Sequence, residues 1–249
     1  MLIRVLFFGL LKDLVGRSAE TVELPEGARL QELLAHYAGQ FPRLREMLPA
    51  LALSVNQEYS RGDRLLRAGD EVALLPPVSG GSGGPGIAEQ GPGGRVRIVR
   101  ERIVTQDVVE QLKLPEDGAA VVFEGVVRNH SRGRRTLYLD YEAYEAMALG
   151  QMRALADEAR ARFGVRDVAI VHRLGRLEIG ETSVLIVVAS AHRGPAFEAC
   201  RWIIDTLKKT VPIWKKEYFE DGAVWADGEP FPEEIRGTGD TAGTEPASK

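Results

Sequence analysis

Lysine is concentrated near the C-terminal end of this 249-residue chain. Four of its seven lysines fall within nine residues: Lys208, Lys209, Lys215 and Lys216. The other 25 basic residues are arginines. Lysine, unlike arginine, can lose its proton or act as a nucleophile when its pKa is lowered, and three neighbouring cations would lower it. A solvated basic helix end is the alternative. The neighbouring residues favour a chemical role for Lys208 and Lys215.

A second candidate lies where a predicted strand meets a predicted helix, in the run Ala191-His192-Arg193-Gly194-Pro195. Pro195 suits the first turn of a helix, and the free amides at a helix start bind anions. Arg193 can bind a phosphate through two hydrogen bonds, and His192 can move a proton near neutral pH. We therefore predict an anion-binding role, with a structural turn carrying an exposed arginine as the alternative.

The third candidate is Arg128, at the end of the strongest predicted strand of the second half, 119–128. Strand ends are common places for ligand-binding groups. A solvated hairpin tip is the alternative, because the next residues, 132–135, are basic. Arg128 is favoured over His130 because it lies nearest the rigid strand.

The first 81 residues end in a sequence that is suited to a different kind of chemistry. Residues 74–81 read Leu-Leu-Pro-Pro-Val-Ser-Gly-Gly, like the end of a carrier protein. Gly80 and Gly81 present no side chain and reach backbone angles closed to other residues, so such a tail can enter another enzyme's pocket. The chain nevertheless continues for 168 residues. We interpret it as a donor domain followed by an acceptor domain.

Other kinds of site find little support. One cysteine and four scattered histidines give no metal-ligand spacing, and no phosphate-binding or dinucleotide loop occurs in its proper context, so we expect no metal or cofactor. A single cysteine excludes an internal disulfide and fits the cytoplasm. The net charge of −4 gives no attraction to nucleic acid or acidic membranes. No apolar run reaches the ~20 residues of a membrane span.

Composition and periodicity divide the chain into four parts. The order of elements in residues 1–81 predicts an α+β β-grasp domain, with a ferredoxin-like arrangement as the alternative. Residues 82–94 are rich in Gly and Pro and predict a flexible linker. Residues 95–230 predict a second domain, and the polar residues 231–249 predict a disordered tail.

The second domain is expected to combine several strands with helices over 148–163 and 196–209. The later helix carries an apolar stripe expected to face the core: Phe197, Cys200, Ile204 and Leu207. Cys200 is therefore interpreted as a small buried apolar residue, not as a nucleophile. Trp214 is expected to form an aromatic wall beside the lysines.

Taken in order, these motifs resemble the molybdopterin synthase family. Residues 1–81 resemble its small subunit, a ubiquitin-like sulfur carrier ending in Gly-Gly, and residues 95–230 resemble its large, catalytic subunit. The matching stretches of the second half are 123–130, 171–175, 190–193, 196–199, 207–208 and 212–217. The resemblance implies a β-grasp domain followed by a hammerhead-type α/β domain with an antiparallel sheet.

The resemblance also implies a reaction. That family inserts two sulfurs from carrier thiocarboxylates into cyclic pyranopterin monophosphate, which builds the dithiolene of molybdopterin. Lys208 corresponds to its principal catalytic lysine and Lys215 to a second, supporting one. The expected partners are an adenylating, sulfur-loading enzyme for the carrier domain and a second copy of the chain, paired as a homodimer through the C-terminal domain.

The remaining site residues follow from the same resemblance. Arg128, His192 and Arg193 are expected to hold the phosphate and the pterin of the substrate. Gly81, preceded by Gly80, is expected to carry the sulfur.

One departure from the family pattern concerns Gly81, which is bonded to Ser82. A peptide carbonyl cannot be adenylated and converted to a thiocarboxylate. Cleavage after Gly81 is the favoured explanation. The alternatives are an inactive fused carrier, with sulfur coming from a separate carrier, and an artificial join.

Two other functions remain open. The chain could be a non-enzymatic β-grasp interaction module fused to a domain that binds a phosphorylated metabolite. It could also bind RNA through residues 132–135 and the lysine cluster, but the net charge and the few interleaved aromatic residues disfavour this.

Overall fold

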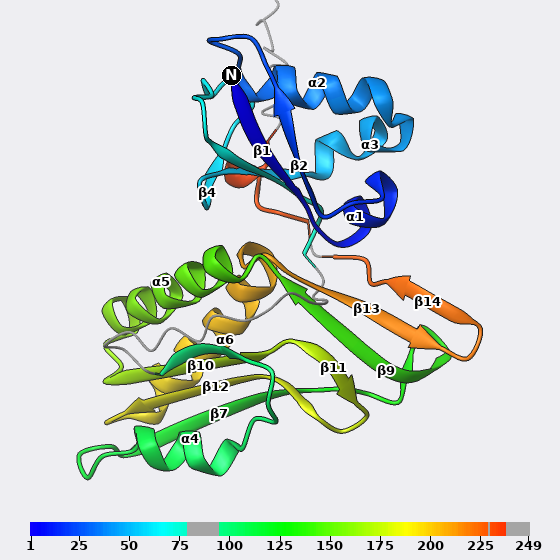
Figure 1. Ribbon diagram of the computed structural model, residues 1–249. Helices are drawn as coiled ribbons and strands as arrows, with labels where there is room; N and C mark the ends of the chain where they lie inside the picture. The colour runs from blue at the N-terminus through cyan, green and yellow to red at the C-terminus, as the bar shows by residue number, and fades with distance from the viewer. Residues whose placement is uncertain (79–94, 229, 238–249) are drawn as a thin grey trace, which may run out of the picture. The chain divides into compact units, whose positions relative to one another are not determined.

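The computed structural model describes residues 1–78, 95–228 and 230–237. The chain forms two compact units (Figure 1). The first comprises Met1–Phe7, Leu11–Pro76 and the described residues from Phe231 onward, and the second comprises Phe8–Leu10 and Pro77–Pro230. The predicted linker, the pair Gly80-Gly81 and the last twelve residues of the predicted tail lie outside the described residues.

The first unit is built on a five-stranded sheet with the order β2-β1-β5-β3-β4. Strand β1 runs antiparallel to β2 and parallel to β5, which in turn is antiparallel to β3. A mixed sheet packed against a helix confirms the predicted β-grasp fold. The strands are β1 (Leu2–Phe7), β2 (Ala19–Glu23), β3 (Ala52–Val55), β4 (Glu58–Ser60) and β5 (Glu71–Leu75).

Helix α2 (Leu30–Gln40) supplies most of the helical side of this core. Its buried residues include Leu30, Leu33, Leu34 and Tyr37, the positions that helical spacing predicted. Four short elements were not predicted: α1 (Gly9–Val15), α3 (Pro42–Met47), the 3₁₀ turn η1 (Leu48–Ala50) and strand β4. They span too few residues for an apolar period to repeat.

Residues 231–237 correct the predicted start of the disordered tail. Phe231 is fully buried, and a 3₁₀ turn, η2 (Glu233–Ile235), follows it. Arg236 then forms an antiparallel bridge with Ala52. These residues are part of the first unit. The mostly polar composition concealed this, because the segment is held by backbone hydrogen bonds and one large apolar anchor.

The second unit contains a four-stranded sheet with the order β6-β10-β12-β7. Strand β6 is parallel to β10, and the other pairs are antiparallel, so the sheet is mixed. Helices α5 and α6 pack on one face and α4 on the other. These elements are β6 (Val96–Val99), α4 (Thr105–Leu112), β7 (Ala119–Val126), α5 (Glu145–Phe163), β10 (Asp167–Arg173), β12 (Thr182–Ser190) and α6 (Arg193–Thr210).

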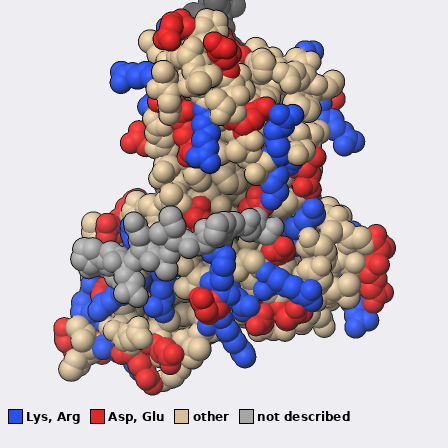
Figure 2. Space-filling view, viewed as in Figure 1, with Lys and Arg blue, Asp and Glu red and all other residues tan. Residues whose placement is uncertain are grey.

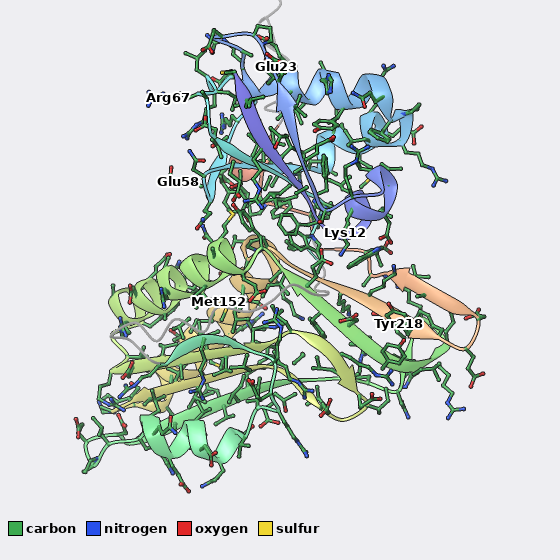
Figure 3. The ribbon with its side chains drawn as sticks, viewed as in Figure 1. Lys12, Glu23, Glu58, Arg67, Met152 and Tyr218 are labelled. Atoms are coloured by element: carbon green, nitrogen blue, oxygen red, sulfur yellow. The ribbon has the colours of Figure 1, made fainter. Side chains whose placement is uncertain are left out.

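A five-stranded antiparallel sheet completes this unit, with the order β11-β9-β13-β14 and with β8 paired to β9. Tyr218, labelled in Figure 3, stacks on Tyr138 of the neighbouring strand with ring centroids 4.3 Å apart. The strands are β8 (His130–Ser131), β9 (Arg134–Ala143), β11 (Gly175–Glu178), β13 (Ile213–Phe219) and β14 (Gly222–Trp225). The predicted α+β class is confirmed for both units.

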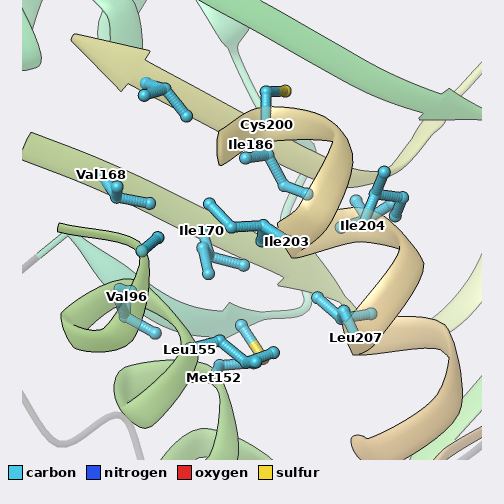
Figure 4. Packing of buried hydrophobic residues seen from close by; sticks show 14 of the residues in the cluster. Val96, Met152, Leu155, Val168, Ile170, Ile186, Cys200, Ile203, Ile204 and Leu207 are labelled. Atoms are coloured by element: carbon cyan, nitrogen blue, oxygen red, sulfur yellow. The ribbon is translucent and has the colours of Figure 1, made fainter. Parts of the chain in front are cut away.

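Helix α6 buries one side against the four-stranded sheet (Figure 4). Cys200 and Leu207 lie on this buried side, as predicted, and Cys200 is a free, 5% exposed thiol. Phe197 was wrongly assigned to the stripe, because its side chain is 61% exposed. Ala196, Ala199 and Ile203 are fully buried instead. Small residues at the first two of these positions let the helix lie close to the sheet.

The surface carries both signs of charge. On the face shown in Figure 2, basic and acidic side chains are interspersed over both units. Within the described residues, no helix combines the length and the apolar character needed to cross a bilayer.

Candidate active site

A cavity of about 530 Å³ lies in the second unit. Strands β7 and β12, the C-terminal turn of α6 and the start of β13 contribute its walls. Three predicted site residues line it: Arg128, Lys208 and Lys215. The other lining residues are Val78, Phe123, Gly125, Val126, Tyr141, His172, Ser183, Val184, Ile204, Leu207, Val211, Ile213, Asp227 and Gly228.

Lys208 and Lys215 line the same cavity because α6 ends just before β13 begins. Lys208 lies exposed in the last turn of the helix, and Lys215 is half-buried on the strand. Side chains alternate along a strand, so Trp214 lies on the opposite face from Lys215. Trp214 is 1% exposed and does not line the cavity. The predicted aromatic wall is therefore wrong for Trp214.

Lys215 has an acidic neighbour that the sequence analysis did not expect. Its Nζ lies 3.1 Å from Oε1 of Glu217, a residue that is only 6% exposed. The two side chains lie on the same face of β13, two residues apart. The register of β13 with β9 places Lys215 opposite Tyr141, whose pKa is raised by burial. Lys215 is thus held in place by a carboxylate.

Arg128 is exposed and lies two residues after the end of β7, beyond the strand that was predicted to reach it. Gly125 and Ser183 line the same cavity, and a hydrogen bond joins them: Oγ of Ser183 donates to the carbonyl of Gly125 at 2.9 Å. A Cβ atom at Gly125 would lie 2.6 Å from Cγ1 of Val184, so a side chain there would displace the side chain of Val184. Neither Arg128 nor Lys208 has an ion-pair partner among the residues that the structure describes.

His172 lies on β10 and lines the same cavity, although the sequence analysis gave it no role. It is 4% exposed, and its Nδ1 lies 3.1 Å from the carbonyl oxygen of Arg173. Burial lowers the pKa of His172 to about 4. The ring is therefore neutral at physiological pH. A neutral Nδ1 that donates to this carbonyl leaves Nε2 as an acceptor.

His192 and Arg193 do not line this cavity. Both are exposed at the start of α6, whereas Lys208 lies in its last turn. The helix rises about 1.5 Å per residue, which separates Arg193 from Lys208 by about 22 Å along the axis. Within one chain, the structure therefore brings together three of the five predicted residues of the second domain and leaves two apart.

Val78 connects the predicted carrier tail to the site. It is 4% exposed, lines the cavity and belongs to the second unit together with Pro77. Gly228 packs against this segment, because a Cβ atom there would lie 2.4 Å from the carbonyl carbon of Pro77. Gly81 follows Val78 by three residues, which span at most about 10 Å.

Comparisons with known proteins agree on both halves. The ThiS family matches residues 5–81, and the MoaE protein family matches residues 98–210. The chain is 48% identical over 127 residues to the molybdopterin synthase catalytic subunit of Thermoplasma volcanium, covering 51% of this chain and 93% of that protein. The catalytic subunit from Halalkalibacterium halodurans is 45% identical over 131 residues, or 53% of this chain and 84% of that protein.

A solved structure supports the same assignment. The crystal structure of molybdopterin synthase from Staphylococcus aureus aligns with a TM-score of 0.52 and 42% sequence identity. The alignment covers 53% of this chain and 96% of that chain.

A sulfur-carrier β-grasp domain joined to a catalytic domain with a cation-lined cavity defines a sulfurtransferase-type enzyme. The chain belongs to the molybdopterin synthase catalytic-subunit family, with a ThiS-type carrier domain in the same polypeptide. It is thereby an enzyme of molybdenum cofactor biosynthesis. The resemblance noted in the sequence is confirmed at this level.

Sequence reasoning missed the buried polar residues of the site. His172 lies within an apolar strand, where a period-2 pattern gives it no distinction from structural residues, and Glu217 lies on β13, a strand that was not predicted. A signal existed for Glu217, because it is the only acidic residue between Lys208 and Phe219. A carboxylate next to a lysine cluster is a natural partner for one of its ammonium groups.

Proposed function

We propose that the cavity lined by Arg128, Lys208 and Lys215 is where this enzyme converts cyclic pyranopterin monophosphate to molybdopterin. The observation that carries the proposal is that three cations from different elements share one cavity with Val78, three residues before Gly81. The substrate's phosphate and the charge that develops during sulfur insertion are both negative. Cations fixed in advance around such charge stabilise a transition state strongly.

Each residue has a separate role in this proposal. Arg128 binds the phosphate, since a guanidinium offers two parallel donors. Lys208 exchanges protons with the reacting atoms, and Lys215, oriented by Glu217, stabilises the developing negative charge. At each of two carbons, a carbon–sulfur bond forms as a carbon–oxygen bond of the substrate breaks. Water then cleaves the acyl carbon–sulfur bond, which leaves sulfur on the pterin and a carboxylate on the carrier.

The sulfur donor is the thiocarboxylate of Gly81, which requires a free C-terminus at that residue. We therefore propose that the chain is cleaved after Gly81 and that an adenylating, sulfur-loading enzyme acts on the released carboxyl. The free thiol of Cys200 is consistent with a cytoplasmic location. Intact mass measurement of the protein from its own cell tests cleavage. Two fragments that meet at Gly81 and Ser82 are expected, and a single uncleaved species contradicts it.

We also propose that a second copy of the chain supplies His192 and Arg193. Strand β7 is the edge strand of its sheet, and it carries the exposed apolar side chains of Val122 and Val126. An exposed edge of this kind is a ready surface for pairing with another strand. Phe197, 61% exposed near the start of α6, adds apolar surface close to Arg193.

The geometry of β7 suits a two-fold partner. The register with β12 puts Ala119 beside Ser190, next to His192, and puts Val126 at the other end beside Thr182. The two ends are about 25 Å apart at the usual strand rise. Antiparallel pairing of β7 with its copy would bring the His192 end of one chain to the Arg128 end of the other. Each site would then draw on both chains.

Mixing two inactive variants tests this arrangement. Arg193→Ala and Lys208→Ala are each expected to lose most sulfur transfer alone. Co-expressed, they form mixed dimers in which one of the two sites keeps both residues, so activity returns to a substantial fraction of wild type. Activity that stays at the level of the single variants would mean that each site lies within one chain.

The activity itself is tested by supplying the protein with thiocarboxylated carrier and the cyclic pterin monophosphate. Formation of the dithiolene product is expected. The rival function, a sensor of a phosphorylated metabolite, predicts binding of the pterin without its conversion.

A further inference from the structure

Phe231 begins a short segment that folds into the first unit although it follows the second unit along the chain. Its ring is fully buried and meets Tyr59 edge-on, with centroids 6.0 Å apart. Burial raises the pKa of Tyr59. The carbonyl of Phe231 accepts a hydrogen bond from Nε of Arg236 at 2.8 Å, which closes the segment on itself.

Gly237 fixes the other end of the segment through its backbone. Its N–H donates to the carbonyl of Leu51 and its carbonyl accepts from the N–H of Gly62, each at 3.0 Å. A Cβ atom at Gly237 would lie 2.3 Å from Cγ of Leu53, so a side chain here would displace Leu53. Both hydrogen bonds join the segment to the β-grasp domain, and the neighbouring Arg236 pairs with Ala52.

We propose that Phe231–Gly237 is a docking segment that keeps the carrier domain attached to the catalytic domain when the chain is opened between residues 78 and 95. The segment is covalently continuous with the second unit, but its contacts are made to Tyr59, Gly62 and the start of β3 in the first unit. A carrier held in this way stays at high effective concentration near its acceptor.

The docking segment differs from the carrier tail in chemistry and place. The predicted tail ends in the pair Gly80-Gly81, whereas the docking segment contributes an aromatic ring and two backbone hydrogen bonds to the β-grasp domain. The contact therefore does not need a thiocarboxylate, a pterin or sulfur transfer. It can be measured whether or not the proposed reaction occurs.

A full-length chain with a sequence-specific protease site placed within residues 82–94 provides the test. After cutting, the two fragments are diluted and the release of the N-terminal fragment is followed by size-exclusion chromatography and native mass spectrometry. The key variant is Gly237→Ala, whose added methyl group collides with Leu53. The matched control is Glu234→Ala, an exposed position in the same turn.

Wild type and Glu234→Ala are expected to release the carrier fragment at equal rates, and Gly237→Ala at least about 10-fold faster. Amide exchange at Gly62, whose N–H donates to Gly237, is expected to accelerate in the same variant. Protection at Leu34, in the buried face of α2, reports that the domain itself stays folded. If that protection is lost, the milder Phe231→Leu gives the same comparison. Equal release from wild type and the segment variants overturns the proposal.

Discussion

The Nζ atom of Lys215 lies 3.1 Å from Oε1 of Glu217, and both side chains lie on one face of β13. The carboxylate is 8% exposed at its side chain, against 29% for the lysine. The buried carboxylate restricts the rotamers of the Lys215 side chain, so the positive charge of the lysine is already in position when the substrate binds. Lys215 is therefore best understood as one half of a pair.

Loss of the carboxylate is expected to impair turnover more than binding. Glu217→Gln keeps the shape of the side chain but removes the charge that orients Lys215, and we expect kcat to fall about 10-fold or more with a smaller change in KM. Glu220→Gln is the matched control, because Glu220 is exposed and pairs with Arg135 away from the cavity. Steady-state sulfur transfer measures both. Equal kcat for the two variants would remove the positioning role.

Arg128 is expected to act mainly on substrate affinity. Arg128→Lys keeps the positive charge but loses the two parallel donors that suit a phosphate, so KM should rise about 10-fold with kcat changed less. Arg135→Lys serves as the control, because its guanidinium pairs with Glu220 and lies outside the cavity. A direct binding measurement with the cyclic pterin monophosphate checks the assignment. Unaltered affinity in the Arg128 variant would contradict it.

The buried His172 makes stability depend on pH. Its pKa is about 4 in the folded chain against 6.5 for an ordinary histidine, so the unfolded chain binds more protons between these values. The contribution of His172 to the free energy of unfolding is therefore fully present above pH 6.5. It falls by about 3 kcal/mol as the pH drops to 4.

Replacing the ring isolates this effect. His172→Asn can still donate to the carbonyl of Arg173 but cannot titrate, so its stability should be flatter than that of wild type between pH 6.5 and 4. His130→Asn, at an exposed position, should follow the wild-type curve. Chemical denaturation at several pH values measures all three. Parallel curves for wild type and His172→Asn would show that this histidine is not the source.

Cys200 is expected to be chemically inert in the folded protein. Its side chain lies in the core of the second unit, and burial raises the pKa of its thiol to about 11, so little thiolate exists at pH 8. A thiol reagent should react slowly with the native chain and at the ordinary rate after unfolding. Cys200→Ala should keep sulfur transfer near the wild-type level. Rapid native labelling, or a loss of activity on substitution, would reopen a role for this residue.

Sequence patterns predicted four of the five strands of the β-grasp sheet, without the three-residue β4, and they predicted α6, whose apolar stripe repeats over several turns. They also singled out Lys208 and Lys215 as members of a lysine cluster around Pro212, but they did not predict β13, the strand that carries Lys215. The predicted helix over 196–209 already separated His192 from Lys208, yet the motif resemblance grouped both in one site, because motif order carries no distance.

The pairing of Lys215 with Glu217 and the burial of Phe231 were missed for different reasons. Glu217 lies two residues after Lys215, so the pairing is local, but it forms because both side chains lie on one face of β13, a strand that was not predicted. Phe231 contacts Tyr59, which is distant in the sequence, and local periodicity cannot report such a contact.

The central claim is that the cations of one cavity in the second unit perform sulfur insertion, and a pair of neighbouring lysines tests it most directly. Lys208 lines the cavity, whereas Lys209, the next residue on the exposed end of α6, does not. Single-turnover conversion of cyclic pyranopterin monophosphate by thiocarboxylated carrier should be lost about 100-fold or more in Lys208→Ala and nearly unchanged in Lys209→Ala, with both variants folded. Wild-type conversion by Lys208→Ala, or an equal loss in both variants, would contradict the account.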